Sequence, residues 1–140
     1  MPKLPKFEND SSYKARGGTA KWLVLICAKC KSDICFYQKD GPGNIFRLYL
    51  DRIADSGANY LFKNLEENEI QKLTCANCGS IIATPMTYGK DAKPRLALRL
   101  IESGVEKIAI KTVEDWDIHK IDLNKTMKCF LVKTKSANQK

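Results

Sequence analysis

CAKC (27–30) and CANCG (75–79) decide the fold, because each carries a Cys-x-x-Cys pair and 44 residues separate the two pairs. A Cys-x-x-Cys turn brings two thiolates together, facing one point, as two corners of a zinc tetrahedron require. Two such turns, at the tips of two hairpins, make a closed site of four thiolates. We therefore predict one structural zinc ion with four protein ligands. The predicted ligands are Cys27, Cys30, Cys75 and Cys78.

The residue after each pair bears on the same prediction. Gly79 follows the second pair, and glycine adopts the positive φ that lets backbone N–H groups point at sulfur. Lys31 stands at this place after the first pair, where its charge would balance part of the thiolate charge. The spacing leaves two alternatives open, which are two disulfide bonds or four cysteines without a ligand.

The N-terminal sequence and the apolar runs predict the compartment. The first 18 residues, MPKLPKFENDSSYKARGG, are polar and broken by prolines, unlike a secretory signal peptide. No apolar run approaches the ~20 residues that span a bilayer. We expect a cytoplasmic protein without a membrane partner. In that reducing compartment cysteines serve as thiols or metal ligands.

The net charge of +8 is concentrated at the two ends. Residues 1–26 hold five Lys and Arg against two acidic residues, and residues 123–140 hold five Lys and no acidic residue. Residues 27–122 hold 14 basic and 14 acidic side chains. A neutral body does not predict a basic binding surface, whereas basic ends can contact an anionic partner such as nucleic acid.

The chain of 140 residues is long enough for one domain with a real core. Prolines and glycines without periodicity predict a flexible basic arm at residues 1–19. Residues 20–135 are predicted to form a single zinc-binding β domain, with its zinc core at 20–113. Residues 136–140 are predicted to be a disordered tail.

Alternating apolar residues and turn signals predict a mainly β fold with at most one or two short helices. Each half has the same plan, in which a strand enters a Cys-x-x-Cys hairpin turn and a strand leaves it. The predicted strands are 20–27, 34–39, 80–89, 94–101, 105–113 and 127–135, with 94–101 and 105–113 paired as a hairpin. Residues 44–53 fit a strand or a helix, and the DGPG turn at 40–43 favours a hairpin. Residues 64–73 are expected to start a short helix.

Two further cysteines and the single histidine offer little catalytic chemistry. Cys35 and Cys129 are interpreted as small buried apolar residues rather than nucleophiles, because an activated thiol needs a base. His119 is the single histidine in the chain. We therefore lean towards a protein that is not an enzyme, although a thiol enzyme using Cys129 or Cys35 stays an alternative.

Aromatic and charged side chains occur together in YQKDGPG (37–43) and YLDRI (49–53), a compact region flanked by loops. If a ligand groove exists, we expect it there, with arginines as anion contacts. The simpler explanation is a turn and a solvated strand face. The candidate groove residues are Tyr37, Arg47, Tyr49 and Arg52.

The two cysteine knuckles with Gly79, in a mainly β chain, resemble the zinc-binding β-tent and zinc-ribbon-like group. That group includes the Yippee proteins, the thalidomide-binding domain of cereblon and the type B methionine sulfoxide reductases. The segment 37–53 also resembles uncharacterised microbial zinc-binding proteins. The resemblance covers roughly residues 20–113 and implies the metal site and the architecture. It does not extend to the reductase activity, because Cys129 stands 51 residues beyond Cys78.

These observations together predict a small zinc-binding protein that acts as a binding or interaction module. A protein or peptide is the first candidate partner. The alternative is a nucleic-acid-associated protein that uses its basic terminal arms.

Overall fold

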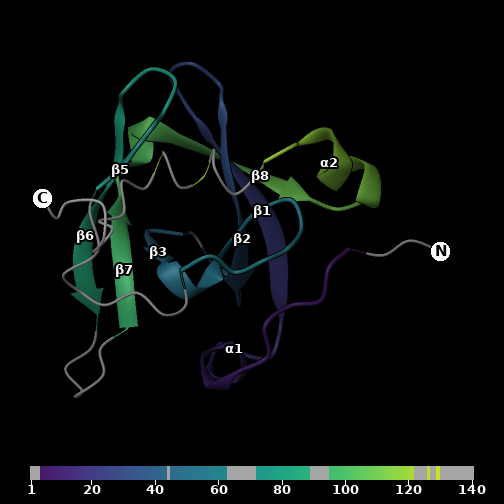
Figure 1. Ribbon diagram of the computed structural model, residues 1–140. Coiled ribbons are helices and arrows are strands. Elements are labelled where there is room, and N and C mark those ends of the chain that lie inside the picture. Colours follow the sequence, from purple (N-terminus) through teal and green to yellow (C-terminus); the bar gives the residue numbers. More distant parts are fainter. Residues whose placement is uncertain are drawn as a thin grey trace, which may run out of the picture.

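Eight strands form two antiparallel sheets in the part of the chain that the computed structural model describes, residues 4–43, 45–62, 72–88 and 95–121 with Thr126 and Cys129. The first sheet has the order β4-β2-β1-β8 and the second the order β3-β7-β6-β5 (Figure 1). The first sheet consists of β1 (Ala20–Cys27), β2 (Asp33–Asp40), β4 (Ile53–Ala54) and β8 (Val105–Ile110). The second consists of β3 (Arg47–Tyr49), β5 (Leu73–Thr74), β6 (Ile81–Tyr88) and β7 (Arg95–Leu100). The predicted mainly β fold is confirmed.

β1 is buried on both faces, which explains the apolar run WLVLIC at 22–27. Because side chains alternate along a strand, its odd-numbered and even-numbered residues enter different cores. Leu23, Leu25 and Cys27 belong to the core between the two sheets. Trp22, Val24 and Ile26 belong to a second core on the other face of the first sheet.

The inter-sheet core is built from both sheets. The second sheet contributes the buried residues Leu48, Leu73, Ile82, Leu98 and Leu100. The first sheet contributes Leu23, Leu25, Ile34, Cys35 and Tyr37. Removing this apolar surface from water is the main force that holds two such sheets face to face.

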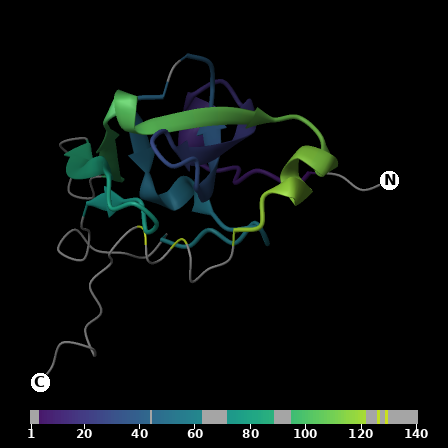
Figure 2. The same cartoon turned by 90° about the horizontal axis from the view of Figure 1, so that it is seen from above.

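Short helix α2 (Val113–Ile118) covers the outer face of the first sheet. Its Trp116 stacks on Phe36 of β2 with ring centroids 3.7 Å apart and an interplanar angle of 7°. Thr112 and Asp115 form a capping box that starts the helix. Figure 2 shows β8 leading across the molecule to this helix.

Residues 4–19, which we interpreted as part of a flexible arm, lie against the same face and include helix α1 (Ser11–Ala15). Phe7 contacts Trp22, with ring centroids 5.5 Å apart, and the indole N–H of Trp22 donates to the carbonyl of Pro5. The side chain of Gln38 exchanges hydrogen bonds of 2.7 and 3.0 Å with the backbone of Glu8.

The predicted hairpin of residues 94–101 and 105–113 is wrong. β7 pairs with β3 and β6 in the second sheet, whereas β8 pairs with β1 in the first. The 3-10 turn η3 (Glu102–Gly104) carries the chain from one sheet to the other. An alternating pattern predicts a strand and its buried face, but does not say which neighbour the strand pairs with.

The described residues 45–53 of the segment 44–53 contain both of the expected conformations. β3 pairs with β7, the 3-10 turn η1 (Leu50–Arg52) follows, and β4 then pairs with β2. The segment therefore crosses between the sheets and is not one strand of a hairpin. Cys129, expected in a strand, has helical backbone. The other residues of the predicted strand 127–135, and most of the helix expected at 64–73, lie outside the described residues.

Candidate metal centre

The two Cys-x-x-Cys turns have the same backbone hydrogen bonds. In the first turn the N–H of Lys31 donates to the carbonyl of Cys27 over 2.8 Å. The N–H of Cys27 donates to the carbonyl of Ser32 over 2.9 Å. The second turn has the same two bonds. The N–H of Gly79 donates to the carbonyl of Cys75 over 2.8 Å, and the N–H of Cys75 donates to the carbonyl of Ser80 over 2.9 Å. The predicted repetition of strand, turn and strand is therefore present at atomic detail.

Lys31 and Gly79 both have positive φ, 66° and 81° respectively. This is the conformation predicted for Gly79, and glycine adopts it without strain. The lysine adopts it as one of two non-glycine residues of the described chain with positive φ. Its ammonium forms an ion pair with Glu106 of β8, so its charge is shared with a carboxylate.

The sulfur atoms of the four predicted ligands form one cluster. Cys27 Sγ lies 3.6 Å from Cys78 Sγ, and Cys30 Sγ lies 3.4 Å from Cys75 Sγ. All four sulfur atoms lie within 4.8 Å of one another. A zinc tetrahedron with Zn–S bonds of about 2.3 Å has sulfur atoms about 3.8 Å apart. The cluster can therefore hold a metal ion.

The four cysteines differ in exposure, and the first cysteine of each pair is the buried one. Cys27 and Cys75 are buried, Cys30 is half-buried and Cys78 is exposed. The hydroxyl of Ser32 lies 3.3 Å from Cys30 Sγ, and that of Ser80 lies 3.2 Å from Cys78 Sγ. Each turn thus places a polar group beside its outer sulfur, as metal sites commonly do.

This difference in surroundings is reflected in the pKa values of the thiols. Hydrogen bonds from Asn77 and then Ser32 lower the pKa of Cys30 to about 5, and hydrogen bonds from Ser80 lower the pKa of Cys78. Burial raises the pKa of Cys75 to about 12. A bound cation deprotonates coordinating thiols outright, so a metal ion would bring Cys75 into the thiolate form that ligation needs.

The remaining cysteines lie outside the cluster. Cys35 is fully buried, and this burial, with the nearby Cys129, raises the pKa of its thiol. Cys129 is 2 % exposed. His119 contacts the carboxylate of Asp33, with Nδ1 and Oδ1 3.0 Å apart. A raised pKa is the opposite of what an activated cysteine nucleophile needs.

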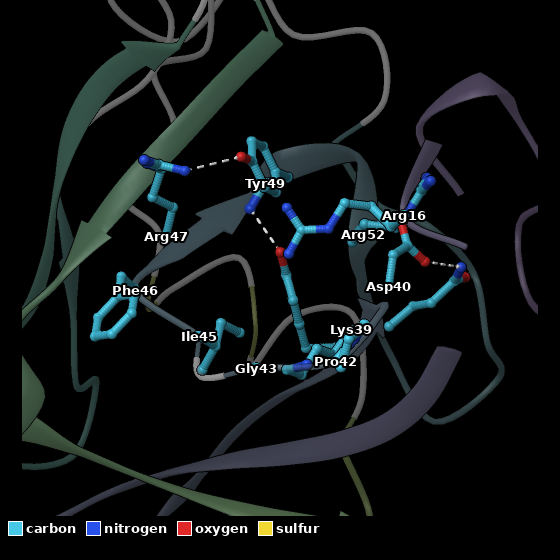
Figure 3. A pocket seen from close by; sticks show the side chains of 12 residues that line it. Arg16, Lys39, Asp40, Pro42, Gly43, Ile45, Phe46, Arg47, Tyr49 and Arg52 are labelled. Atoms are coloured by element: carbon cyan, nitrogen blue, oxygen red, sulfur yellow. Dashed lines mark hydrogen bonds and ion pairs between the residues drawn. The ribbon is translucent and has the colours of Figure 1, made fainter. Parts of the chain in front are cut away.

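The structure also brings together the four candidate groove residues. Tyr37, Arg47, Tyr49 and Arg52 all line one cavity of about 380 Å³ (Figure 3). The backbone N–H of Tyr49 donates to the hydroxyl of Tyr37 over 2.8 Å, and Arg47 donates to the hydroxyl of Tyr49 over 3.2 Å. Arg52, however, directs its guanidinium at the carboxylates of Asp10 and Asp40.

Sequence reasoning missed residues at both sites. Ser32 and Ser80 were detectable, because a serine stands two residues after the second cysteine of each pair. Lys39 lies within the YQKDGPG segment, but a lysine beside a turn is ordinarily solvated and gave no separate signal. Arg16 gave no signal, because it reaches the cavity only through the packing of the N-terminal segment.

No protein-family model, curated protein or solved structure matches this chain. Within the described residues, no helix has the length and apolar character needed to cross a membrane. The case for function therefore rests on the chain's own residues.

Proposed function

We propose that this protein binds one structural zinc ion through Cys27, Cys30, Cys75 and Cys78 and works as a cytoplasmic binding module. The observation that carries the proposal is the gathering of four sulfur atoms within 4.8 Å, two from each sheet. Four sulfur ligands suit zinc, which is soft enough for thiolates and needs no redox chemistry. We also propose that the chain is related to the zinc-binding β-tent proteins, which its two cysteine turns resemble.

The structural role follows from the number and position of the ligands. Four protein ligands complete the tetrahedron and leave no position for water or substrate. The first pair lies where β1 turns into β2, with Cys27 the last residue of β1, and the second pair lies in the turn between β5 and β6. One ion would therefore join the two sheets. Figure 1 shows both turns at the same end of the molecule.

The binding role is supported by the position of the cavity. β2 begins at Asp33, directly after the first knuckle, and ends at Asp40, which lines the cavity. The proposed zinc ion and the cavity therefore lie at opposite ends of this strand. In such an arrangement the metal fixes the two sheets at one end, and side chains from both sheets stay available at the other.

The test is a native mass spectrum of the protein purified from its own host without chelator. We expect one zinc mass per chain, and its loss in the variant Cys78→Ser. The matched control is Cys129→Ala, which removes a sulfur outside the cluster and should keep the zinc mass. A chain without zinc and four protons lighter would contain two disulfide bonds and would refute the proposal.

A further inference from the structure

The cavity that contains the groove residues is assembled from three parts of the chain. It lies between the end of β2 with the following turn at 41–43, the segment 45–52, and Arg16 at the end of α1. Its volume of about 380 Å³ is in the range of small-molecule sites. The inference below deepens the proposed binding function and does not depend on the metal.

The charges around the cavity favour an anion. Four cationic side chains line it, and Asp40 is the one acidic residue among the described lining residues. Three carboxylates surround Arg52, which is 1 % exposed, at 2.7 to 3.9 Å. The four lining cations outnumber these three carboxylates. The lining cations are Arg16, Lys39, Arg47 and Arg52.

Lys39 is the most informative of these cations. It is 7 % exposed, and its ammonium donates a 2.6 Å hydrogen bond to the carbonyl of Gly41. An ammonium has three donors, and in the described part of the chain no carboxylate lies within ion-pair distance of this one. Burial, and then the charges of Lys21 and Arg16, lower the pKa of Lys39. The carboxylate of Asp40 attracts this ammonium only from beyond ion-pair distance. Burying a cation without a close counterion is costly, and an anion in the cavity would relieve that cost.

Aromatic and apolar side chains form the rest of the wall. The hydroxyl of Tyr37 accepts from the backbone N–H of Tyr49, and the hydroxyl of Tyr49 accepts from Arg47. Phe46, which is 57 % exposed, lines the same cavity. Flat rings of this kind offer a stacking surface to a planar ligand. Figure 3 shows Phe46 and Arg47 on one side of the cavity and Lys39, Asp40 and Arg16 on another.

We propose that this cavity binds a small organic anion with a flat apolar body, whose anionic group contacts Lys39 and Arg16 and whose body lies against Phe46 and Tyr49. A phosphate monoester and a carboxylate share this chemistry. A cavity of about 380 Å³ has room for one such molecule.

The test is calorimetric titration of the purified protein, with its zinc content measured first, using four probes. These are 1-naphthyl phosphate, 1-naphthoate, neutral 1-naphthol and inorganic phosphate. We expect saturable binding of at least one of the two naphthyl anions, on the order of ten-fold tighter than that of naphthol or inorganic phosphate. The tighter of the two anions identifies the anionic group. No saturable binding of either naphthyl anion would overturn the proposal. A short single-stranded oligonucleotide is titrated separately, and its tight binding in place of the naphthyl anions would also overturn the proposal.

Variants connect the binding to the cavity. Lys39→Met, and separately the exposed Arg16→Gln, should each weaken the bound anion on the order of ten-fold, because each removes a charge-assisted contact. The matched control is Lys111→Met, which removes an exposed lysine outside the cavity and should leave the affinity unchanged. Wild-type affinity in both cavity variants would refute the proposed site. If the protein contains zinc but binds none of the probes, the proposed anion site is wrong and the proposed zinc site stands. If the protein contains no zinc but binds a naphthyl anion, the proposed zinc site is wrong and the anion site stands.

Discussion

Lys31 and Gly79 have the same backbone conformation but very different side chains. Both follow the second cysteine of a pair, and their N–H groups close the same hydrogen bond to the first cysteine. A side chain at positive φ is strained for an L-residue, by roughly 1–2 kcal/mol. A Cβ built at Gly79 meets no atom within 4 Å, so the backbone conformation alone decides the cost at this position.

We predict opposite effects on stability for the two exchanges. Gly79→Ala should lower the free energy of unfolding, and Lys31→Gly should raise it, each by about 0.5–1 kcal/mol after the entropy of glycine in the unfolded chain is counted. The measurement is denaturant unfolding of the zinc-loaded protein. Lys31 also forms an ion pair with Glu106. To remove that ion pair from the comparison, the effect of Lys31→Gly is measured in a protein that already carries Glu106→Gln. Effects of the same sign would contradict this account.

The clustering of the four cysteines could be predicted from sequence because each pair lies within one turn, where spacing fixes geometry. Four of the cavity residues could be predicted for a similar reason, since Tyr37, Arg47, Tyr49 and Arg52 lie within one short stretch of sequence. The role of Arg52 could not be predicted. Its guanidinium pairs with Asp10, which stands 42 residues earlier in the chain and is placed there by tertiary packing.

At the scale of elements, Arg52 connects η1 to the N-terminal segment and to β2. Its guanidinium donates to Asp40 at the end of β2 over 2.9 Å, and to both carboxylate oxygens of Asp10 over 2.7 and 3.1 Å. Asp10 is also the N-cap of α1. One buried side chain therefore joins three elements.

We predict that Arg52→Met lowers the free energy of unfolding by about 3 kcal/mol, because it leaves the buried carboxylate of Asp40 without its cation. The control is Asp51→Asn, which removes the more distant carboxylate at 3.9 Å and should change stability by less than about 1 kcal/mol. Thermal or denaturant unfolding measures both. An Arg52 variant as stable as the control would show that the network contributes little.

One connection that sequence reasoning misplaced is that between β7 and β8. Gly104 in η3 accepts a hydrogen bond from Ala28 in the first knuckle, and Ile101 donates one to Ile82 of β6. The turn is therefore held by both sheets. Such contacts between distant parts of the chain leave no local pattern, whereas β1, β2 and β6 were recognised because their apolar residues and turns are local.

At the scale of the whole molecule, the two sheets meet in one core and the cysteine cluster joins them at one end. The inter-sheet core also contains Cys27 and Cys75, so the proposed metal site is continuous with the packing. A cation bound by all four sulfur atoms would link the two sheets at this end, and without it that link is lost. Stability should therefore depend on the metal.

We predict that a strong chelator at neutral pH lowers the melting temperature, and that added zinc restores it. Acidification should act in the same direction, because protons compete with the metal for the thiolates. Circular dichroism, with zinc release followed by a chromogenic chelator, measures both quantities on one sample. Release of the metal without a change in melting would show that the ion is not structural.

The most direct measurement of the central claim is X-ray absorption at the zinc edge of the protein purified without chelator. The account predicts one zinc ion per chain with four sulfur neighbours at about 2.3 Å and no oxygen or nitrogen neighbour. A spectrum with oxygen or nitrogen in the first coordination sphere, or a protein without zinc, would contradict a closed four-cysteine site.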